Sequence, residues 1–259
     1  MKGLLDLHWQ SCFIDETPGD SIEGGSIRQV LNACWSRVKP TIVPEPKIVA
    51  WSDEMAKTLN LEKKEESLLS GNETCKGMDP YSQCYGGHQF GTWAGQLGDG
   101  RAISLGEVKS KNGILELQLK GSGLTPYSRT ADGKAVLRSS IREFLCSEAM
   151  FHLGVPTTRA LSLCTTGEDI SRDMFYDGNP ADEQGAIICR VAPSFLRFGS
   201  YQIHTIRGDN KTLESLVTYT LKTHFSHLES DGDDLLIDWL REMVETTAHM
   251  VIEWMRVGF

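Results

Sequence analysis

The alternation of apolar and polar residues predicts a strand hairpin near the middle of this 259-residue chain. Leucines at positions 115, 117 and 119 share one predicted face, because side chains alternate along a strand. The segment 101–108 has the composition of the preceding strand, and Asn112-Gly113 is a strong signal for the turn between them. The other face of the second strand is expected to carry Glu116, Gln118 and, at the strand end, Lys120.

A helix and two more strands are predicted after this hairpin. Ser140-Ile-Arg-Glu143 matches a capping box, so we expect a helix that begins near Ser140, with Glu143 in its first turn. Gly154 and Pro156 are typical of its end. Residues 157–164 and 185–191 are predicted to be strands, joined by a polar loop.

The two ends of the chain differ from this middle part. Residues 1–80 have a mixed pattern, with one short helix predicted over 52–61 from its Ser-Asp cap. Residues 213–227 and 234–257 carry apolar residues at helical spacing. A small antiparallel sheet with one inserted helix, followed by further helices, is the order in which a protein-kinase-like fold begins. We therefore expect an α+β, protein-kinase-like fold.

The composition excludes several classes of protein. The chain is 40% hydrophobic and 24% charged, and no apolar run reaches the roughly eighteen residues that span a bilayer, so no membrane span is expected. A net charge of −9 argues against a nucleic-acid surface, which needs clustered Lys and Arg. The seven cysteines form no CxxC pair and indicate neither a zinc site nor a disulfide scaffold. His224-x-x-His227 supplies only half of a metal site.

Six glycines lie within the seventeen residues from Tyr85 to Arg101. Glycine inside a strand or helix costs roughly 0.5 to 1 kcal/mol relative to alanine, so this density is typical of sharp turns or of backbone that approaches a ligand closely. A hairpin that ends in a lysine follows this segment. The combination indicates a nucleotide phosphate as the ligand.

Phosphate-binding loops differ in the spacing of their residues. The chain has no GxxxxGK[ST], and Gly98-x-Gly100 lacks the third glycine of a dinucleotide-binding GxGxxG. A kinase-type site fits better, with the glycines in a turn, Lys120 on the next strand and Glu143 on the following helix to orient the lysine. Taken alone, Lys120 is also typical of a solvated strand end, and Glu143 of a capping box.

Three blocks of unusual composition carry a family resemblance: YGGHQFGTWAGQLGDGRA, then LQLKGSGLTPYSRTADGKAVLRSSIREFLCSEAMFHLGVPTTRAL, then CRVAPSFLRFGSY. Over roughly residues 42–259 the chain resembles selenoprotein O, a family of kinase-like proteins also found in bacteria. The resemblance implies a kinase-like fold that binds ATP in a flipped orientation. It also implies a protein adenylyltransferase, which transfers AMP from ATP to the hydroxyl groups of Ser, Thr or Tyr in protein substrates.

The same resemblance assigns roles to individual residues. Glu143 is expected to orient Lys120. Paired donors on arginine suit phosphate, and positive charge stabilises the negative charge that develops as the leaving group departs. In the flipped pose the α-phosphorus of ATP faces the incoming hydroxyl. The residues expected to bind the nucleotide are Gly98, Gly100, Arg101, Lys120, Asp132, Gly133, Arg190 and Arg197.

Family members continue into segments that these 259 residues do not contain. A His-Gly-x-x-Asn-Thr-Asp-Asn segment provides the base and a metal ligand, and a later Asp-Tyr-Gly binds Mg²⁺. No catalytic base and no metal ligand is therefore expected before Phe259, and Mg²⁺ is expected in the complete protein. The resemblance implies an N-terminal extension over 1–80, a nucleotide-binding N-lobe over 81–200, and the start of a truncated helical C-lobe over 201–259.

Three hypotheses about function stay open from the sequence. The chain is the front part of an adenylyltransferase, or of a conventional protein kinase that transfers the γ-phosphate, or it is a truncated module that binds nucleotide or a partner without catalysis. The location is inferred from the resemblance alone. We expect a mitochondrial protein, because the blocks are closer to the eukaryotic pattern, with a cytoplasmic location as the alternative.

Overall fold

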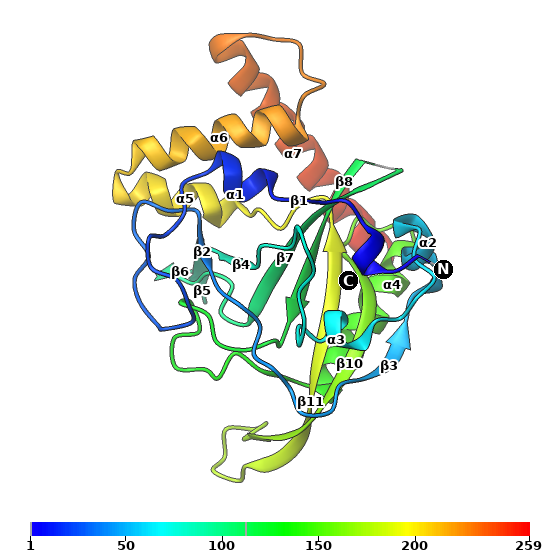
Figure 1. Cartoon of the computed structure of the whole chain (residues 1–259). Coiled ribbons are helices and arrows are strands. Elements are labelled where there is room, and N and C mark those ends of the chain that lie inside the picture. The colour runs from blue at the N-terminus through cyan, green and yellow to red at the C-terminus, as the bar shows by residue number, and fades with distance from the viewer. Residues whose placement is uncertain (1, 112) are drawn as a thin grey trace.

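The computed structural model describes residues 2–111 and 113–259 of the chain. They form a mixed α+β fold built on a nine-stranded antiparallel sheet flanked by helices (Figure 1). The main path of the sheet runs β2-β4-β7-β8-β11-β10-β3, with β1 paired to β7 and β9 paired to β11. The α+β class and the antiparallel sheet are thus confirmed. The strands are β1 (Trp9–Gln10), β2 (Trp35–Arg37), β3 (Lys47–Trp51), β4 (Tyr81–Gln83), β5 (Gly86–Gln89), β6 (Thr92–Gln96), β7 (Ala102–Ser110), β8 (Gly113–Lys120), β9 (Ala135–Val136), β10 (Arg159–Arg172) and β11 (Ala181–Ala192).

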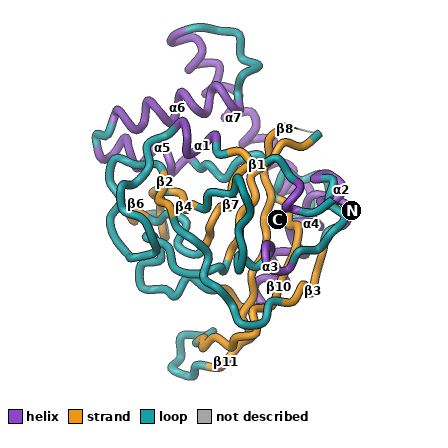
Figure 2. Tube along the Cα trace, in the orientation of Figure 1, coloured by secondary structure: helices purple, strands orange, loops and turns teal. Residues whose placement is uncertain are grey.

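Helices pack against the faces and one end of this sheet. In Figure 2, α5 and α6 lie side by side at one end of the molecule, and α7 leads away from them. Helix α4 packs on β10 and β11. The helices are η1 (Leu4–Asp6), α1 (Cys12–Glu16), α2 (Asp53–Leu59), α3 (Glu66–Leu69), α4 (Leu137–His152), α5 (Phe198–Arg207), α6 (Asn210–His224) and α7 (Gly232–Arg256).

The predicted hairpin is confirmed as β7 and β8, which pair from Ala102 opposite Lys120 to Ser110 opposite Gly113. Asn112, part of the predicted turn, lies outside the described residues. The leucine face of β8 is buried in the main core, as its alternation predicts. The polar face is buried too, since Glu116 is 3% exposed and Gln118 is 0% exposed. The burial of this polar face was not predicted, because the polar face of a strand is normally exposed to solvent.

Helix α4 begins at Leu137 rather than near Ser140. Strand β9 pairs with β11 and leads directly into the helix, so Val136 is the N-cap residue. The predicted capping box is therefore wrong: Glu143 lies in the second turn and bonds to Lys120 instead of to backbone. The pairing of β9 is a long-range contact, and the local pattern carries no trace of it. The predicted end is confirmed, because Gly154 follows the C-cap residue with φ +79°.

The two strands predicted over 157–164 and 185–191 are both longer in the structure. β10 continues to Arg172 and β11 begins at Ala181, so the connecting loop covers only 173–180. A register shift between Thr165 and Asp169, with Gly167 at φ +79°, interrupts the alternation within β10. Such a bulge inserts extra residues into one strand and hides its period of two. Helix α5 was not predicted, whereas α6 and α7 match the predicted helices within a few residues.

The first 80 residues contribute three strands to the same sheet. β1, β2 and β3 pair with β7, β4 and β10, so the predicted extension and the predicted N-lobe share one sheet. The helix predicted over 52–61 is confirmed as α2, where the Ser52 hydroxyl accepts a hydrogen bond from the backbone N–H of Met55 at 3.3 Å. The three-segment division itself stays a prediction. Among the described residues, no helix is long and apolar enough to cross a membrane.

The long helix α7 buries none of its residues, although its pattern is amphipathic. Its apolar side chains and Phe198 border an open groove of about 540 Å³. Contiguous apolar surface on a monomer favours association. We therefore expect this 259-residue chain to self-associate in sedimentation velocity, and Val244→Glu, which places a charge in the groove, to shift it toward monomer. A monodisperse monomer at micromolar concentration would contradict the prediction.

Candidate functional site

A cavity of about 860 Å³ lies where the turn before β7, the end of β8, the segment 127–134 and β11 meet. Glu143 lines a smaller adjoining cavity of about 340 Å³, which shares Arg101 and Lys120 with the first. The structure thus brings together residues that lie up to 112 positions apart, from Tyr85 to Arg197. The large cavity is lined by every residue predicted to bind the nucleotide: Gly98, Gly100, Arg101, Lys120, Asp132, Gly133, Arg190 and Arg197.

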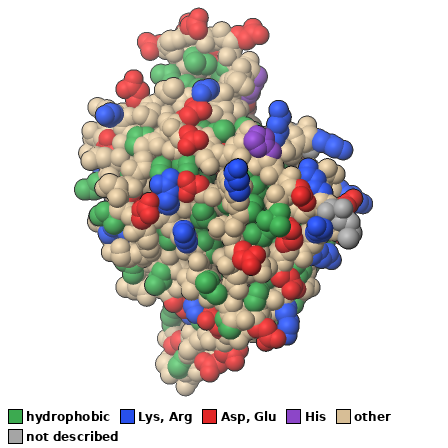
Figure 3. Space-filling model, viewed as in Figure 1, with side chains coloured by type: hydrophobic (Ala, Val, Ile, Leu, Met, Phe, Trp, Pro, Cys, Tyr) green, Lys and Arg blue, Asp and Glu red, His purple; other side chains and the backbone are tan. Residues whose placement is uncertain are grey.

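The lining of this cavity is strongly basic although the chain has a net charge of −9. Seven Lys or Arg side chains line it, against two aspartates. The sequence did not predict that three of these cations line the cavity, because no spacing rule connects them to the glycine-rich segment; they are Arg129, Lys134 and Arg172. In the view of Figure 3, acidic side chains gather at the top and at the bottom of the molecule, over the α6–α7 connection and the β10–β11 hairpin. The cavity therefore concentrates positive charge in an acidic protein, an arrangement that suits an anionic ligand.

The turn from Gly98 to Gly100 forms one wall of the cavity and needs both of its glycines. Gly98 has φ +63°, and a Cβ atom there would lie 2.2 Å from Cγ of Tyr127. A Cβ atom on Gly100 would lie 2.7 Å from the carbonyl oxygen of Tyr127. The glycines thus allow close packing of this turn on the segment that carries Tyr127, which shapes the wall.

The other glycines between Tyr85 and Arg101 lie in a second structural element. Residues 86–96 form a separate hairpin, β5–β6, that packs on α5. A Cβ atom on Gly199 would lie 1.9 Å from the carbonyl oxygen of Gly86, so hairpin and helix meet at backbone distance. The hairpin contributes Gln89 to the cavity. Sharp turns and close backbone contacts within the protein therefore account for much of the glycine density.

Lys120 and Glu143 form an ion pair between the end of β8 and α4. The second carboxylate oxygen of Glu143 lies 3.5 Å from Nη1 of Arg190, so one glutamate contacts cations from two strands. Burial lowers the pKa of Lys120, and the charge of Glu143 acts in the opposite direction. The glutamate thus restricts a flexible lysine to the cavity wall.

Each of the two arginines on the β11 side of the cavity lies over an aromatic ring. The guanidinium carbon of Arg190 is 4.9 Å from the ring centroid of Phe195, and that of Arg197 is 4.8 Å from the ring of Tyr85. Among the described residues, Nε of Arg190 is buried and has no hydrogen-bond partner. A buried donor without a partner costs free energy unless a ligand satisfies it, so this guanidinium fits an anionic ligand.

Asp99 and Asp132, the two aspartates that line the cavity, already have hydrogen-bond partners. Oδ2 of Asp99 accepts hydrogen bonds from the backbone of Gln83 and the side chain of Gln118, and Asp132 forms two bonds with Arg172 at 2.8 and 2.9 Å. Among residues 2–111 and 113–259, no three His, Cys, Asp or Glu side chains converge as metal ligands. The donor set present here therefore does not fit Mg²⁺, which prefers octahedral oxygen coordination.

Comparisons with known proteins place the chain in a family. The family described as protein adenylyltransferase SelO matches residues 25–259. Proteins named protein nucleotidyltransferase YdiU from Methylobacillus flagellatus, Rhodopirellula baltica and Tolumonas auensis are 55%, 56% and 56% identical, over 98% of this chain in each case. The matches cover 50%, 49% and 50% of those proteins, so the chain spans about half the length of the curated relatives it matches. With a family match over most of its residues and identity near 55% across nearly all of them, the chain belongs to the SelO family of protein adenylyltransferases.

Proposed function

We propose that this chain forms the nucleotide-binding part of a protein that transfers AMP from ATP to Ser, Thr or Tyr hydroxyl groups of other proteins. The observation that supports it best is the convergence of Lys120, Arg190 and Arg197 on one cavity. Such a cluster suits a polyphosphate, because each cation offers charge-assisted hydrogen bonds to phosphate oxygens. Membership of the SelO family favours ATP as the nucleotide and a protein as the acceptor.

The residues have distinct roles in this proposal. Lys120, oriented by Glu143, and the two arginines hold the phosphates, and the turn at Gly98 and Gly100 provides the wall beside them. The hydroxyl oxygen of the acceptor attacks the α-phosphorus, the bond to the oxygen that bridges the α and β phosphates breaks, and pyrophosphate leaves. The hydroxyl proton passes to a base that the family resemblance places after Phe259. Alignment and electrostatic stabilisation supply most of the catalysis in such transfers.

The remaining predicted residues shape the cavity. Gly133 has φ +72°, and a Cβ atom there would lie 2.1 Å from the carbonyl oxygen of Gly123. Asp132 is held by Arg172 and thereby joins the segment 127–134 to the end of β10. Mg²⁺ belongs to the proposal only as an expectation for the whole protein. No step is assigned to it, because the carboxylates described here already have cationic or backbone partners.

Labelled ATP tests the proposed reaction. Whole-length protein that contains this chain, incubated with a mixed protein substrate and Mg²⁺ or Mn²⁺, is expected to leave label on protein from α-labelled ATP and none from γ-labelled ATP. A conventional kinase would give the opposite result. Absence of label from both positions, together with tight ATP binding, would favour a non-catalytic nucleotide-binding module. A Lys120→Ala variant serves as the control for label that does not depend on the cavity.

A further inference from the structure

A buried carboxylate lies directly behind the two arginines of the cavity. Asp99 stands between Gly98 and Gly100 and is only 3% exposed. Its backbone is fixed on both sides, since its N–H donates to the carbonyl of Gln83 at 3.0 Å and its carbonyl accepts from the Thr125 hydroxyl at 2.8 Å. A buried carboxylate costs free energy unless it is paired, so its position calls for a reason.

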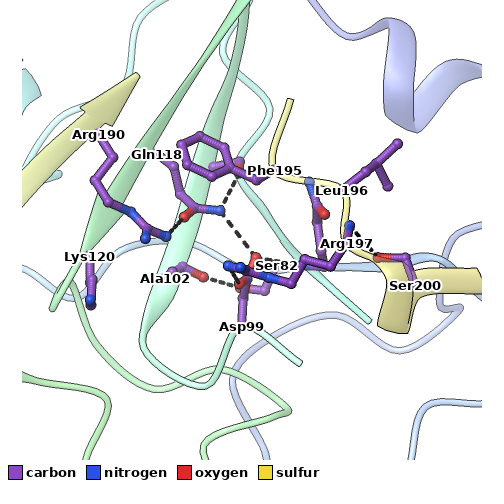
Figure 4. A network of polar contacts seen from close by, with 12 residues as sticks. Ser82, Asp99, Ala102, Gln118, Lys120, Arg190, Phe195, Leu196, Arg197 and Ser200 are labelled. Atoms are coloured by element: carbon purple, nitrogen blue, oxygen red, sulfur yellow. Dashed lines mark hydrogen bonds and ion pairs between the residues drawn. The ribbon is translucent and has the colours of Figure 1, made fainter. Parts of the chain in front are cut away.

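Gln118 connects this carboxylate to Arg190 (Figure 4). Its amide nitrogen donates to Oδ2 of Asp99 and to Oγ of Ser104, both at 3.1 Å. Its amide oxygen accepts a hydrogen bond from Nη2 of Arg190, which faces Gln118 directly in the β8–β11 ladder. One side chain therefore contacts the carboxylate on one side and the guanidinium on the other.

The chemistry of the neighbours determines which way the Gln118 amide points. The Asp99 carboxylate can only accept, and the Ser104 hydroxyl gives its proton to Glu116, so Ser104 accepts from Gln118 as well. Both positions therefore require the amide NH₂ group. The oxygen of the amide must then point to Arg190, where it holds the guanidinium from behind.

The same carboxylate also faces the second arginine. Oδ1 of Asp99 lies 3.9 Å from Nη2 of Arg197, and the Arg197 side chain, which lines the cavity, is 42% exposed. Nη1 of Arg190 lies 3.5 Å from Oε1 of Glu143, and Glu143 also forms the ion pair with Lys120. The three cations proposed to hold phosphates are thus linked by two carboxylates and one amide, of which Asp99 borders the large cavity and Glu143 the adjoining one.

We propose that Asp99 and Gln118 are positioning residues of the nucleotide site: the Asp99 carboxylate orients the Gln118 amide, which holds Arg190, and the same carboxylate faces Arg197. Neither residue needs to touch the nucleotide, and both act through the arginines. The inference rests on the proposed function, because it concerns how the arginines are set for the phosphates of ATP. It predicts that the effect of Gln118 on ATP affinity depends on the presence of Arg190.

A double-mutant cycle with ATP as the probe tests this dependence. Gln118→Met keeps the length of the side chain and removes the amide. We expect it to raise the dissociation constant for ATP about tenfold in the chain that has Arg190, since a hydrogen bond to a charged group is lost. In an Arg190→Ala background the same change is expected to alter the constant less than about twofold, because the group through which it acts is gone. Gln184→Met, the same change at an exposed site on β11, is the matched control.

Asp99→Asn is the second variant, for the case in which Gln118→Met fails to fold. It keeps the shape of the side chain and removes the charge, so we expect an ATP affinity about tenfold weaker, with little further effect once both arginines are alanine. Far-ultraviolet circular dichroism and the urea midpoint confirm folding of each variant. The inference would be overturned if Gln118→Met and Asp99→Asn weakened ATP binding equally with and without the arginines, or if neither variant changed the ATP affinity. If Arg190→Ala and Arg197→Ala themselves left ATP affinity unchanged, the proposed function would fail first.

Discussion

Replacing Lys120 by alanine is expected to raise the dissociation constant for ATP by about ten- to a hundredfold. The lysine is the only side chain of β8 that lines the cavity among the described residues, and Glu143 holds it there. A hydrogen bond between charged groups contributes about 1.5 to 3 kcal/mol, which corresponds to that range of affinity. Isothermal titration with ATP measures the change. Lys109→Ala, an exposed lysine on β7 outside the cavity, is the matched control.

A second substitution separates the charge of Glu143 from its position. Glu143→Gln retains an oxygen that can accept from Lys120 but lacks the charge that acts on Lys120 and Arg190. We expect a smaller loss of ATP affinity than for Lys120→Ala. If the Lys120→Ala variant bound ATP as the unchanged chain does, the role assigned to this lysine would be wrong, and the basic cavity would need another ligand.

The contribution of Glu116 to stability is expected to fall as the pH rises from about 4.5 to about 7, through the ionisation of its carboxyl group. This glutamate is 3% exposed, and burial raises its pKa to about 7, while hydrogen bonds from Ser104 and Tyr81 act in the opposite direction. The folded state then binds the proton more tightly than the unfolded chain, whose glutamate has a pKa near 4.5. Between these two values the contribution of Glu116 to the free energy of unfolding decreases with pH, by about 3 kcal/mol for a shift of this size.

Urea unfolding at pH 5 and at pH 8 measures this effect in the chain and in Glu116→Gln. The amide keeps an oxygen that can accept from Ser104 and Tyr81, and it does not titrate. From pH 5 to pH 8 the free energy of unfolding of the parent is therefore expected to change by about 2 to 3 kcal/mol relative to that of the variant, in the direction of lower stability at pH 8. Burial also raises the pKa of Glu107, which faces Glu116 across the β7–β8 pair, so only the difference between variant and parent isolates Glu116. Glu73→Gln, at an exposed site, is the control, and equal slopes in all three proteins would refute the prediction.

Local pattern was sufficient for the elements that depend on neighbouring residues. The hairpin β7–β8 and the Ser52 cap of α2 were predicted correctly, because alternation and capping involve residues a few positions apart. The start of α4 was not predicted correctly, because β9 pairs with β11 just before the helix. The length of β10 was not predicted either, because a bulge interrupts the alternation of that strand. Each of these depends on contacts between residues distant in the sequence.

The sequence by itself determined the class of the fold, the family, and the residue types of the site, since alternation, capping and family motifs are all properties of the chain order. Only the tertiary structure decided how those residues meet. Gln118 faces Arg190 because β8 pairs with β11, 72 positions further along the chain. The buried position of Asp99, the burial of the polar face of β8 and the additional cations of the cavity likewise depend on contacts between segments that are distant in the sequence. Side-chain identity is a local property, whereas the strand order that places an amide between a carboxylate and a guanidinium is set by the packing of the whole sheet.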